Sequence, residues 1–174
     1  AKAPEMDIKQ ISVGNRSTIV VLDGVEKPGN IGAVVRSVDA SGADAVLLTG
    51  SSTDPFNANA IRASSGAVFN VPIVRLETEE ALRWLNAHGF AIALARVDAE
   101  KLFWDLPFDA KIAIVFGSEA HGLGNQWNAI ADHMFRIPMH GISDSLNVSV
   151  STAIVLYEAT RQKLNAAGTM LAGE

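Results

Sequence analysis

The 174-residue sequence contains no cysteine, no long apolar run and little positive charge. The absence of cysteine excludes disulfide bonds, thiolate zinc sites and cysteine nucleophiles within the chain. It is compatible with a reducing compartment, and we expect a cytoplasmic protein. No apolar run approaches the roughly 20 residues that cross a bilayer, and residues 1–7 lack the apolar core of a signal peptide. We therefore expect no membrane partner.

The 14 lysine and arginine residues are outnumbered by 19 aspartate and glutamate residues, which gives a net charge of −5. A freestanding nucleic-acid-binding protein is more often basic, because phosphate contacts supply much of its affinity. If this chain acts on nucleic acid, we expect another segment to help bind it. The chain begins with Ala1 rather than methionine, which is compatible with processing or with a piece of a longer protein.

Short apolar runs alternate with amphipathic stretches along the chain. Strands are predicted at Thr18–Asp23, Ala45–Thr49, Val71–Arg75, Phe90–Ala95, Ile112–Phe116 and Phe135–Ile137. Helices are predicted from Ile31 to a stop at Gly42, and at Asn57–Ser64, Thr78–His88 with Thr78 as N-cap, Gln126–Asp132 and Asn147–Leu164. The strands are continuous apolar runs, which indicates that both sheet faces are covered. The pattern predicts an α/β fold with a mostly parallel sheet flanked by helices.

The composition, with 48% hydrophobic residues, is that of one globular domain. We expect this domain to span residues 18–165. Residues 1–17 are expected to form an N-terminal extension or linker remnant, with residues 1–16 loosely held, and residues 166–174 a flexible tail.

The segment from Asp23 to Arg36 follows the first predicted strand, at the sheet edge where ligands of open parallel sheets bind. The apolar stripe of its helix centres near Ile31 and Val35, and Arg36 points about 150° away from it. Arg36 could be an ordinary solvated arginine. We expect Arg36 to lie near the start of its helix, where it opposes the helix dipole, and this favours a bound anion such as an RNA phosphate. Asn30 could simply be the N-cap.

The segment from Phe116 to Gly124 follows the fifth predicted strand and holds Gly117 and Gly122 as well. Glycines let a backbone wrap closely around a ligand. The spacing is neither that of a phosphate-binding Walker loop nor that of a dinucleotide fingerprint. Taken alone, this segment could equally be a plain loop that binds no ligand.

The segment from Ile137 to Tyr157 is a polar loop that runs into a helix whose first turns are apolar on nearly every side. A helix that is apolar all round is buried. Either the chain end passes through the fold, or a second subunit covers this helix. Ser145 and Asn147 could be simple capping residues.

Together the three segments resemble the SpoU (TrmH-like) branch of the SPOUT superfamily of RNA methyltransferases. The three motifs of that branch are matched by Asn30-Ile-Gly-Ala-Val-Val-Arg36, by Phe116-Gly-Ser-Glu119 with Gly122-Leu123, and by Ile137-Pro-Met with Ser145-Leu-Asn-Val-Ser-Val. Their order and spacing agree, and the resemblance covers about residues 18–164. It implies S-adenosylmethionine-dependent methylation of a ribose 2′-hydroxyl in structured RNA, either rRNA or tRNA.

The resemblance also implies features that periodicity could not give. They are a deep C-terminal trefoil knot, a homodimer formed through the knot region, and a bent S-adenosylmethionine held by the knot loops. The implied cofactor-binding residues are Phe116, Gly117, Ser118, Gly122, Ile137, Met139, Ser145, Leu146 and Asn147. The implied catalytic residues are Arg36, Asn30, Glu119, Ser145 and Asn147.

A ribose hydroxyl is a poor nucleophile until it loses its proton, whereas a methyl carbon on a sulfonium is already activated. The protein must align the reacting atoms and assist proton removal, and no metal is required. Because a guanidinium is always protonated, we expect Arg36 to orient ribose and phosphate and to stabilise the developing alkoxide. Glu119 could instead anchor a loop through backbone N–H groups. His121 and His140 lie in the right loops, but the family pattern assigns them no role.

Three alternatives remain at this point. The chain could be a catalytically inactive knotted RNA-binding or assembly protein, a nucleotide-binding domain of flavodoxin or Rossmann type, or a SPOUT enzyme that methylates a base. Many family members carry an N-terminal RNA-binding domain of the L30e type. Here about 17 residues precede the first predicted strand, and we expect such a domain to be missing from this chain.

Overall fold

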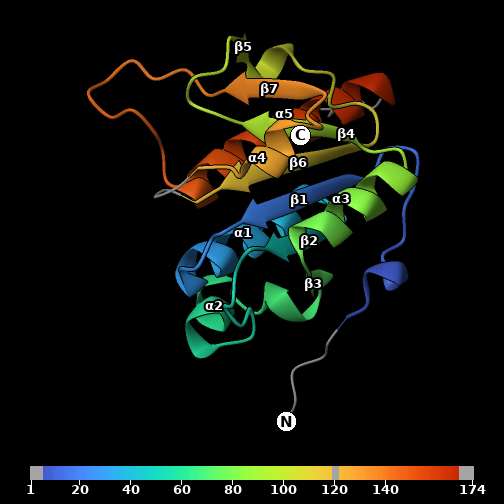
Figure 1. The fold of residues 1–174 in the computed structure, drawn as a ribbon, viewed down its shortest axis with the longest axis vertical. Coiled ribbons are helices and arrows are strands. Elements are labelled where there is room, and N and C mark those ends of the chain that lie inside the picture. The colour runs from blue at the N-terminus through green and yellow to red at the C-terminus, as the bar shows by residue number, and fades with distance from the viewer. Residues whose placement is uncertain (1–5, 119–121, 169–174) are drawn as a thin grey trace, which may run out of the picture.

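Seven parallel strands form the centre of the fold in a computed structural model that describes residues 6–118 and 122–168 (Figure 1). They are β1 (Thr18–Asp23), β2 (Ala45–Thr49), β3 (Ile73–Arg75), β4 (Ala91–Ala95), β5 (Lys101–Leu102), β6 (Ile112–Gly117) and β7 (His133–Arg136). Their order in the sheet is β3-β2-β1-β6-β4-β7-β5. The predicted α/β fold with a parallel sheet is confirmed. The sequence did not predict β5, because two residues are too few to show a period.

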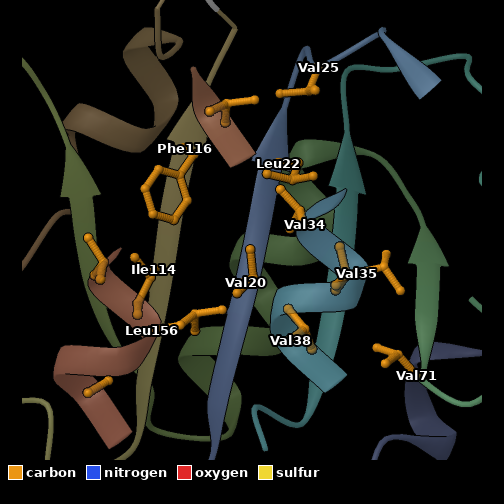
Figure 2. Close-up of a cluster of buried hydrophobic side chains, with 14 of the residues drawn as sticks. Val20, Leu22, Val25, Val34, Val35, Val38, Val71, Ile114, Phe116 and Leu156 are labelled. Atoms are coloured by element: carbon orange, nitrogen blue, oxygen red, sulfur yellow. The ribbon is translucent and has the colours of Figure 1, made fainter. Parts of the chain in front are cut away.

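Helices cover both faces of the sheet (Figure 1). They are α1 (Pro28–Ser41), α2 (Ala58–Ala63), α3 (Thr78–Ala87), α4 (Asn125–Asn128) and α5 (Val148–Ala166), with short 3₁₀ turns at Ile8–Gln10 (η1), Ala67–Phe69 (η2) and Phe103–Asp105 (η3). One apolar cluster lies between the sheet and α1, η2 and α5. A second lies on the other face, with α3 and the N-terminal segment. Figure 2 shows the first cluster, where Val34 and Val38 of α1 and Leu156 of α5 meet Val20 of β1.

Three local predictions need correction. The prediction that the N-terminal segment is loosely held is wrong for residues 7–11, because Asp7 caps η1 and Ile8 and Ile11 are buried in the second cluster. Thr78 is not an N-cap: α3 begins there, and its hydroxyl donates to Asp23 Oδ1 at 3.5 Å. The last helix also reaches Ala166, one residue into the predicted tail.

Helices α1 and α5 lie side by side and run in the same direction. Asn147 meets Asn30 near their first turns, and the Thr160 hydroxyl donates to the carbonyl of Ser41 at the last residue of α1. On its other flank α1 touches α2 so closely that a Cβ on Gly32 would lie 2.3 Å from the carbonyl oxygen of Ala60. Glycine is therefore required at position 32 by packing between helices. This arrangement holds motif one between motif three and α2.

Within this chain the last helix is buried on one face and open on the other, so the cover of its open face by a second subunit stays a prediction. The sheet and α1 bury one face, which includes Val148, Thr152 and Val155. Val150 and Tyr157 remain 46% and 55% exposed. Strand β7 lies beyond β4 in the sheet, toward the β5 edge. From there the chain returns toward the middle of the sheet, where α5 packs against α1. A C-terminal trefoil knot requires such a return, but the knot itself stays a prediction.

Candidate active site

A cavity of about 510 Å³ lies at the carboxyl ends of β4, β6 and β7. The arrows of β1, β4, β6 and β7 in Figure 1 point toward this edge, where the long loop before α5 (orange) also lies. The lining residues are Ala95, Arg96, Val97, Asp98, Phe116, Gly117, Ser118, Gly122, Leu123, Phe135, Arg136, Ile137, Met139, Asp144, Ser145, Leu146, Val148 and Ser151. Eight of the nine predicted cofactor-binding residues are in this set. The exception is Asn147, whose two neighbours in sequence both line the cavity.

The glycine segment after β6 folds into a tight turn against the end of its own strand. Ser118 and Gly122 form an antiparallel bridge, and the Gly122 N–H donates to the Ser118 carbonyl at 3.0 Å. A Cβ on Gly117 would lie 2.5 Å from the backbone of Gly122 and 2.8 Å from Leu123 N. Position 117 must therefore be glycine for the turn to close over the strand end. The predicted Glu119 and His121 lie outside the described residues.

Motifs one and three meet through Asn30 and Asn147. Asn147 Nδ2 donates to Asn30 Oδ1 at 3.2 Å. Asn147 Oδ1 also accepts from the backbone N–H and the hydroxyl of Ser149, at 2.9 and 2.7 Å, and so caps α5. The reading of Asn30 as an N-cap is wrong, because α1 begins at Pro28 with Lys27 in that position. The capping role considered for Asn147 is confirmed.

Arg36 lies in the middle of α1 rather than near its start, so the dipole argument for a bound anion does not apply. It follows Asn30 by six residues, which places the two side chains about 120° apart and ~9 Å along the axis. Arg36 is exposed as predicted, is absent from the cavity lining, and makes no hydrogen bond or ion pair with any described residue. It faces the flank of α1 that carries Gly32 and α2.

The sequence analysis missed a polar network in the cavity wall. Arg96 Nε and Nη2 donate to the two carboxylate oxygens of Asp98 at 2.8 Å, and Nη1 donates to Asn128 Oδ1 of α4 at 2.7 Å. These hydrogen bonds hold the pKa of the Asp98 carboxyl below its usual value. Arg96 directly follows β4, so the rule that ligands bind at strand ends could have singled it out. Arg136 and Asp144, which were also missed, line the same cavity.

His140 is exposed in the loop before α5 and does not line the cavity. Within residues 6–118 and 122–168, no group of three or more histidine, aspartate and glutamate residues is arranged to hold a metal ion. In the same part of the chain, no helix is long and apolar enough to cross a membrane.

Comparison with known proteins agrees with this geometry. The chain is 33% identical over 168 residues to a 23S rRNA (uridine(2479)-2'-O)-methyltransferase of Streptomyces viridochromogenes, covering 93% of this chain and 58% of that protein. It is 36% identical over 162 residues to the 23S rRNA (guanosine-2'-O-)-methyltransferase RlmB of Xylella fastidiosa, covering 91% and 65%. The chain thus spans about three fifths of the length of these curated relatives.

The fold matches the crystal structure of the SpoU methyltransferase AviRb from Streptomyces viridochromogenes with a TM-score of 0.89 and 30% identity, over 94% of this chain and 66% of that one. The structure of AviRb in complex with AdoMet matches with a TM-score of 0.87 and 30% identity, over 92% and 63%. The model of the SpoU rRNA Methylase family matches residues 17–157, which include all three motifs. The chain therefore belongs to the SpoU rRNA Methylase family.

Proposed function

We propose that this chain is the catalytic domain, over residues 18–165, of an S-adenosylmethionine-dependent RNA methyltransferase that modifies a ribose 2′-hydroxyl. The observation that carries the proposal is the cavity at the ends of β4, β6 and β7, which residues of motifs two and three line. The hydrogen bond from Asn147 to Asn30 brings motif one to the same edge of the sheet. Two curated relatives are named 2′-O-methyltransferases of 23S rRNA, one for a uridine and one for a guanosine.

The residues of the cavity fit S-adenosylmethionine. A volume of about 510 Å³ lies within the range of ~300–1,000 Å³ that suits a ligand of this size. Phe116, Ile137 and Leu146 provide an apolar wall for the adenine ring, and the half-buried Ser118 and the exposed Ser145 also line the cavity. Gly117, the last residue of β6, lines the cavity without a side chain. We assign the cofactor to Phe116, Gly117, Ser118, Gly122, Ile137, Met139, Ser145, Leu146 and Asn147.

When bound, S-adenosylmethionine supplies a methyl carbon that its sulfonium has already activated. The protein therefore has to orient the ribose and assist the loss of its hydroxyl proton. Asn30 accepts a hydrogen bond from Asn147, while its own amide N–H groups donate to no described residue. These N–H groups are available to the ribose oxygen as negative charge develops on it. Ser145 contributes a hydroxyl from the cavity wall.

Arg36 acts on the RNA rather than on the cofactor. Its exposed guanidinium is outside the cavity wall and has no carboxylate partner among the described residues. A guanidinium binds phosphate through paired hydrogen bonds and stays protonated at neutral pH. Arg36 would hold a phosphate next to the target ribose and stabilise the alkoxide. Glu119 completes the proposed catalytic set, as the family resemblance implies.

We further propose a homodimer through the C-terminal region. Val150, Ile154 and Tyr157 follow the i, i+4, i+7 spacing of one helix face, and Val150 and Tyr157 are exposed. An apolar stripe on the helix that carries motif three is a natural contact for a second copy. We also propose that an RNA-binding segment outside this chain helps recognise the RNA in the cytoplasm. The net charge of −5 supports such a segment.

Calorimetry and radiolabel transfer test the proposed function together. The purified chain should bind S-adenosylmethionine and move its labelled methyl group to rRNA or tRNA, with the label recovered as a 2′-O-methylated nucleoside after digestion. The variant Leu146→Asp places a charge in the cavity wall and should abolish cofactor binding, whereas Asn15→Asp, which precedes β1 and lies outside the cavity lining, should not. Label recovered on a base, or absence of binding at millimolar cofactor, would contradict the proposal.

A further inference from the structure

Beside α1 lies an exposed aromatic side chain that the active-site cavity does not use. Phe69 of η2 is 63% exposed, the largest exposed fraction of any aromatic residue in the described part of the chain. Its ring packs against the half-buried ring of Phe56, with centroids 6.1 Å apart and a tilt of 32°. Phe56 in turn packs against the main apolar cluster. Phe69 is therefore held by the fold while it presents a ring face to solvent.

This aromatic pair is attached to the segment that leads into motif one. The loop that contains Phe56 is anchored by Thr53, whose hydroxyl donates to the Glu26 carbonyl at 2.6 Å, and by Ser51, whose hydroxyl donates to the Val25 carbonyl at 2.9 Å. Residues 24–27 lead directly into α1. Helix α2 packs against α1 at Gly32, one helical turn before Arg36, and turn η2 also packs against α1.

Three arginines of the described residues form ion pairs and five do not, and two of those five lie in this region. Arg83, Arg96 and Arg161 each pair with a carboxylate within 3.9 Å. Arg36 of α1 and Arg62 of α2 are both exposed, and neither pairs with a carboxylate of the described residues. An apolar protein partner would have to bury these two charges without a counterion, which is costly. RNA supplies phosphates for the guanidinium groups and flat bases for the ring.

We propose that Arg36, Phe56, Arg62 and Phe69 form a stacking surface that holds an unpaired nucleotide of the RNA next to the methylated ribose. The base stacks on Phe69, Phe56 supports the Phe69 ring from behind, and the two arginines bind flanking phosphates. This inference rests on the proposed function for the identity of the RNA as substrate. It adds a contact outside the cofactor cavity that selects single-stranded or bulged RNA.

Fluorescence anisotropy with a labelled single-stranded RNA of mixed sequence, in the presence of S-adenosylmethionine, tests the stacking surface. Phe69→Ala should weaken RNA binding by roughly 5- to 100-fold, and Phe69→Trp should restore it, because any aromatic ring can stack on a base. Phe69→Leu, which keeps an apolar side chain, should remain weak. Arg62→Gln should reduce the slope of affinity against salt by about one.

Trp104→Leu is the matched control. Trp104 is also an exposed aromatic residue, at 46%, but it lies after β5 at the opposite edge of the sheet. This variant should bind RNA as the unmodified chain does. Equal RNA affinity of Phe69→Ala and the unmodified chain would overturn the inference. So would a change in sedimentation caused by Phe69→Ala, since that result would mean a protein contact.

Failure of the inference and failure of the proposed function give different results. If the unmodified chain methylates a ribose and Phe69→Ala leaves the KM for RNA unchanged, only the stacking surface is wrong. If the unmodified chain binds no S-adenosylmethionine, the proposed function fails, whereas the anisotropy series still tests the surface. Calorimetry should show the same cofactor affinity for Phe69→Ala and the unmodified chain.

Discussion

Asn147 and Asn30 are 117 residues apart in the sequence, and the side-chain amide of the first donates to that of the second at 3.2 Å. The same Asn147 side chain caps α5 through the Ser149 N–H. One residue thus fixes the start of the last helix and links it to the first turn of α1. Two of its functions, capping and linking, can be separated by substitution.

Asn147→Ala should lose both functions. Removal of an N-cap costs about 1 kcal/mol, which lowers Tm by roughly 2–4 °C in a chain of this size. Asn147→Asp keeps the cap acceptor but loses the N–H that donates to Asn30, so its Tm should stay near that of the unmodified chain. Methyl transfer should fall in both variants. Calorimetric melting and a transfer assay check this, and full activity of Asn147→Asp would show that the link to Asn30 is dispensable.

Gly117→Ala should disrupt the turn after β6, because the added Cβ would lie 2.5 Å from the Gly122 backbone. Overpacking of this kind costs about 1–3 kcal/mol, and the displaced turn should no longer bind S-adenosylmethionine well. Gly141→Ala is the matched control, since a Cβ there meets nothing within 4 Å. Urea unfolding and calorimetry measure the two effects. Unchanged cofactor affinity in Gly117→Ala would contradict the assignment of this turn to the cofactor site.

Arg36→Gln should reduce methyl transfer by at least about a hundredfold. It should leave cofactor affinity intact, because Arg36 does not line the cavity. Stability should hardly change, since the side chain is exposed. Arg83→Gln, an exposed arginine on α3, serves as control. Single-turnover methyl transfer and calorimetry with S-adenosylmethionine measure the two effects. Substantial turnover by Arg36→Gln would exclude the proposed role.

Arg96→Gln and Asp98→Asn should each weaken S-adenosylmethionine binding by less than about fivefold, because both break one partly exposed ion pair in the cavity wall. Arg96→Gln also loses the hydrogen bond to Asn128, so the double variant should bind no worse than Arg96→Gln alone. Additive losses in the three calorimetric titrations would show that each side chain contacts the ligand independently.

Lys163 gives the chain a pH dependence on the alkaline side. Its ammonium donates to the Arg16 carbonyl and the Thr18 hydroxyl. Burial lowers its pKa, a nearby Asp44 carboxylate opposes that shift, and Arg16 adds to it. Between the lowered folded pKa and the unfolded value of about 10.4, the unfolded chain binds more protons. Stability should therefore rise as pH rises through the folded pKa.

The rise in stability is measured as the difference in the urea midpoint of unfolding between the unmodified chain and Lys163→Gln, at a series of pH values. The difference should increase toward alkaline pH, because only the unmodified chain has this titrating group. Subtracting the variant removes the contribution of every other group in the chain. Parallel curves for the two proteins would show that burial does not perturb Lys163.

The sequence by itself determined every strand except β5, the five helices and the three motif loops, because each depends on a local period or on neighbouring residues. Apolar runs such as Ile112–Phe116 and the stripe around Ile31 and Val35 identified buried strands and one face of α1. The family resemblance identified the loops after β6 and before α5, and their residues do line one cavity.

Only the tertiary structure decided how these pieces meet. It placed β6 between β1 and β4, joined Asn30 to Asn147, and left Arg36 outside the cavity wall. It also showed Arg96 as part of the cavity and left one face of α5 open. Contacts between segments more than a hundred residues apart depend on the packing of whole layers, and no local pattern of residue types contains that information.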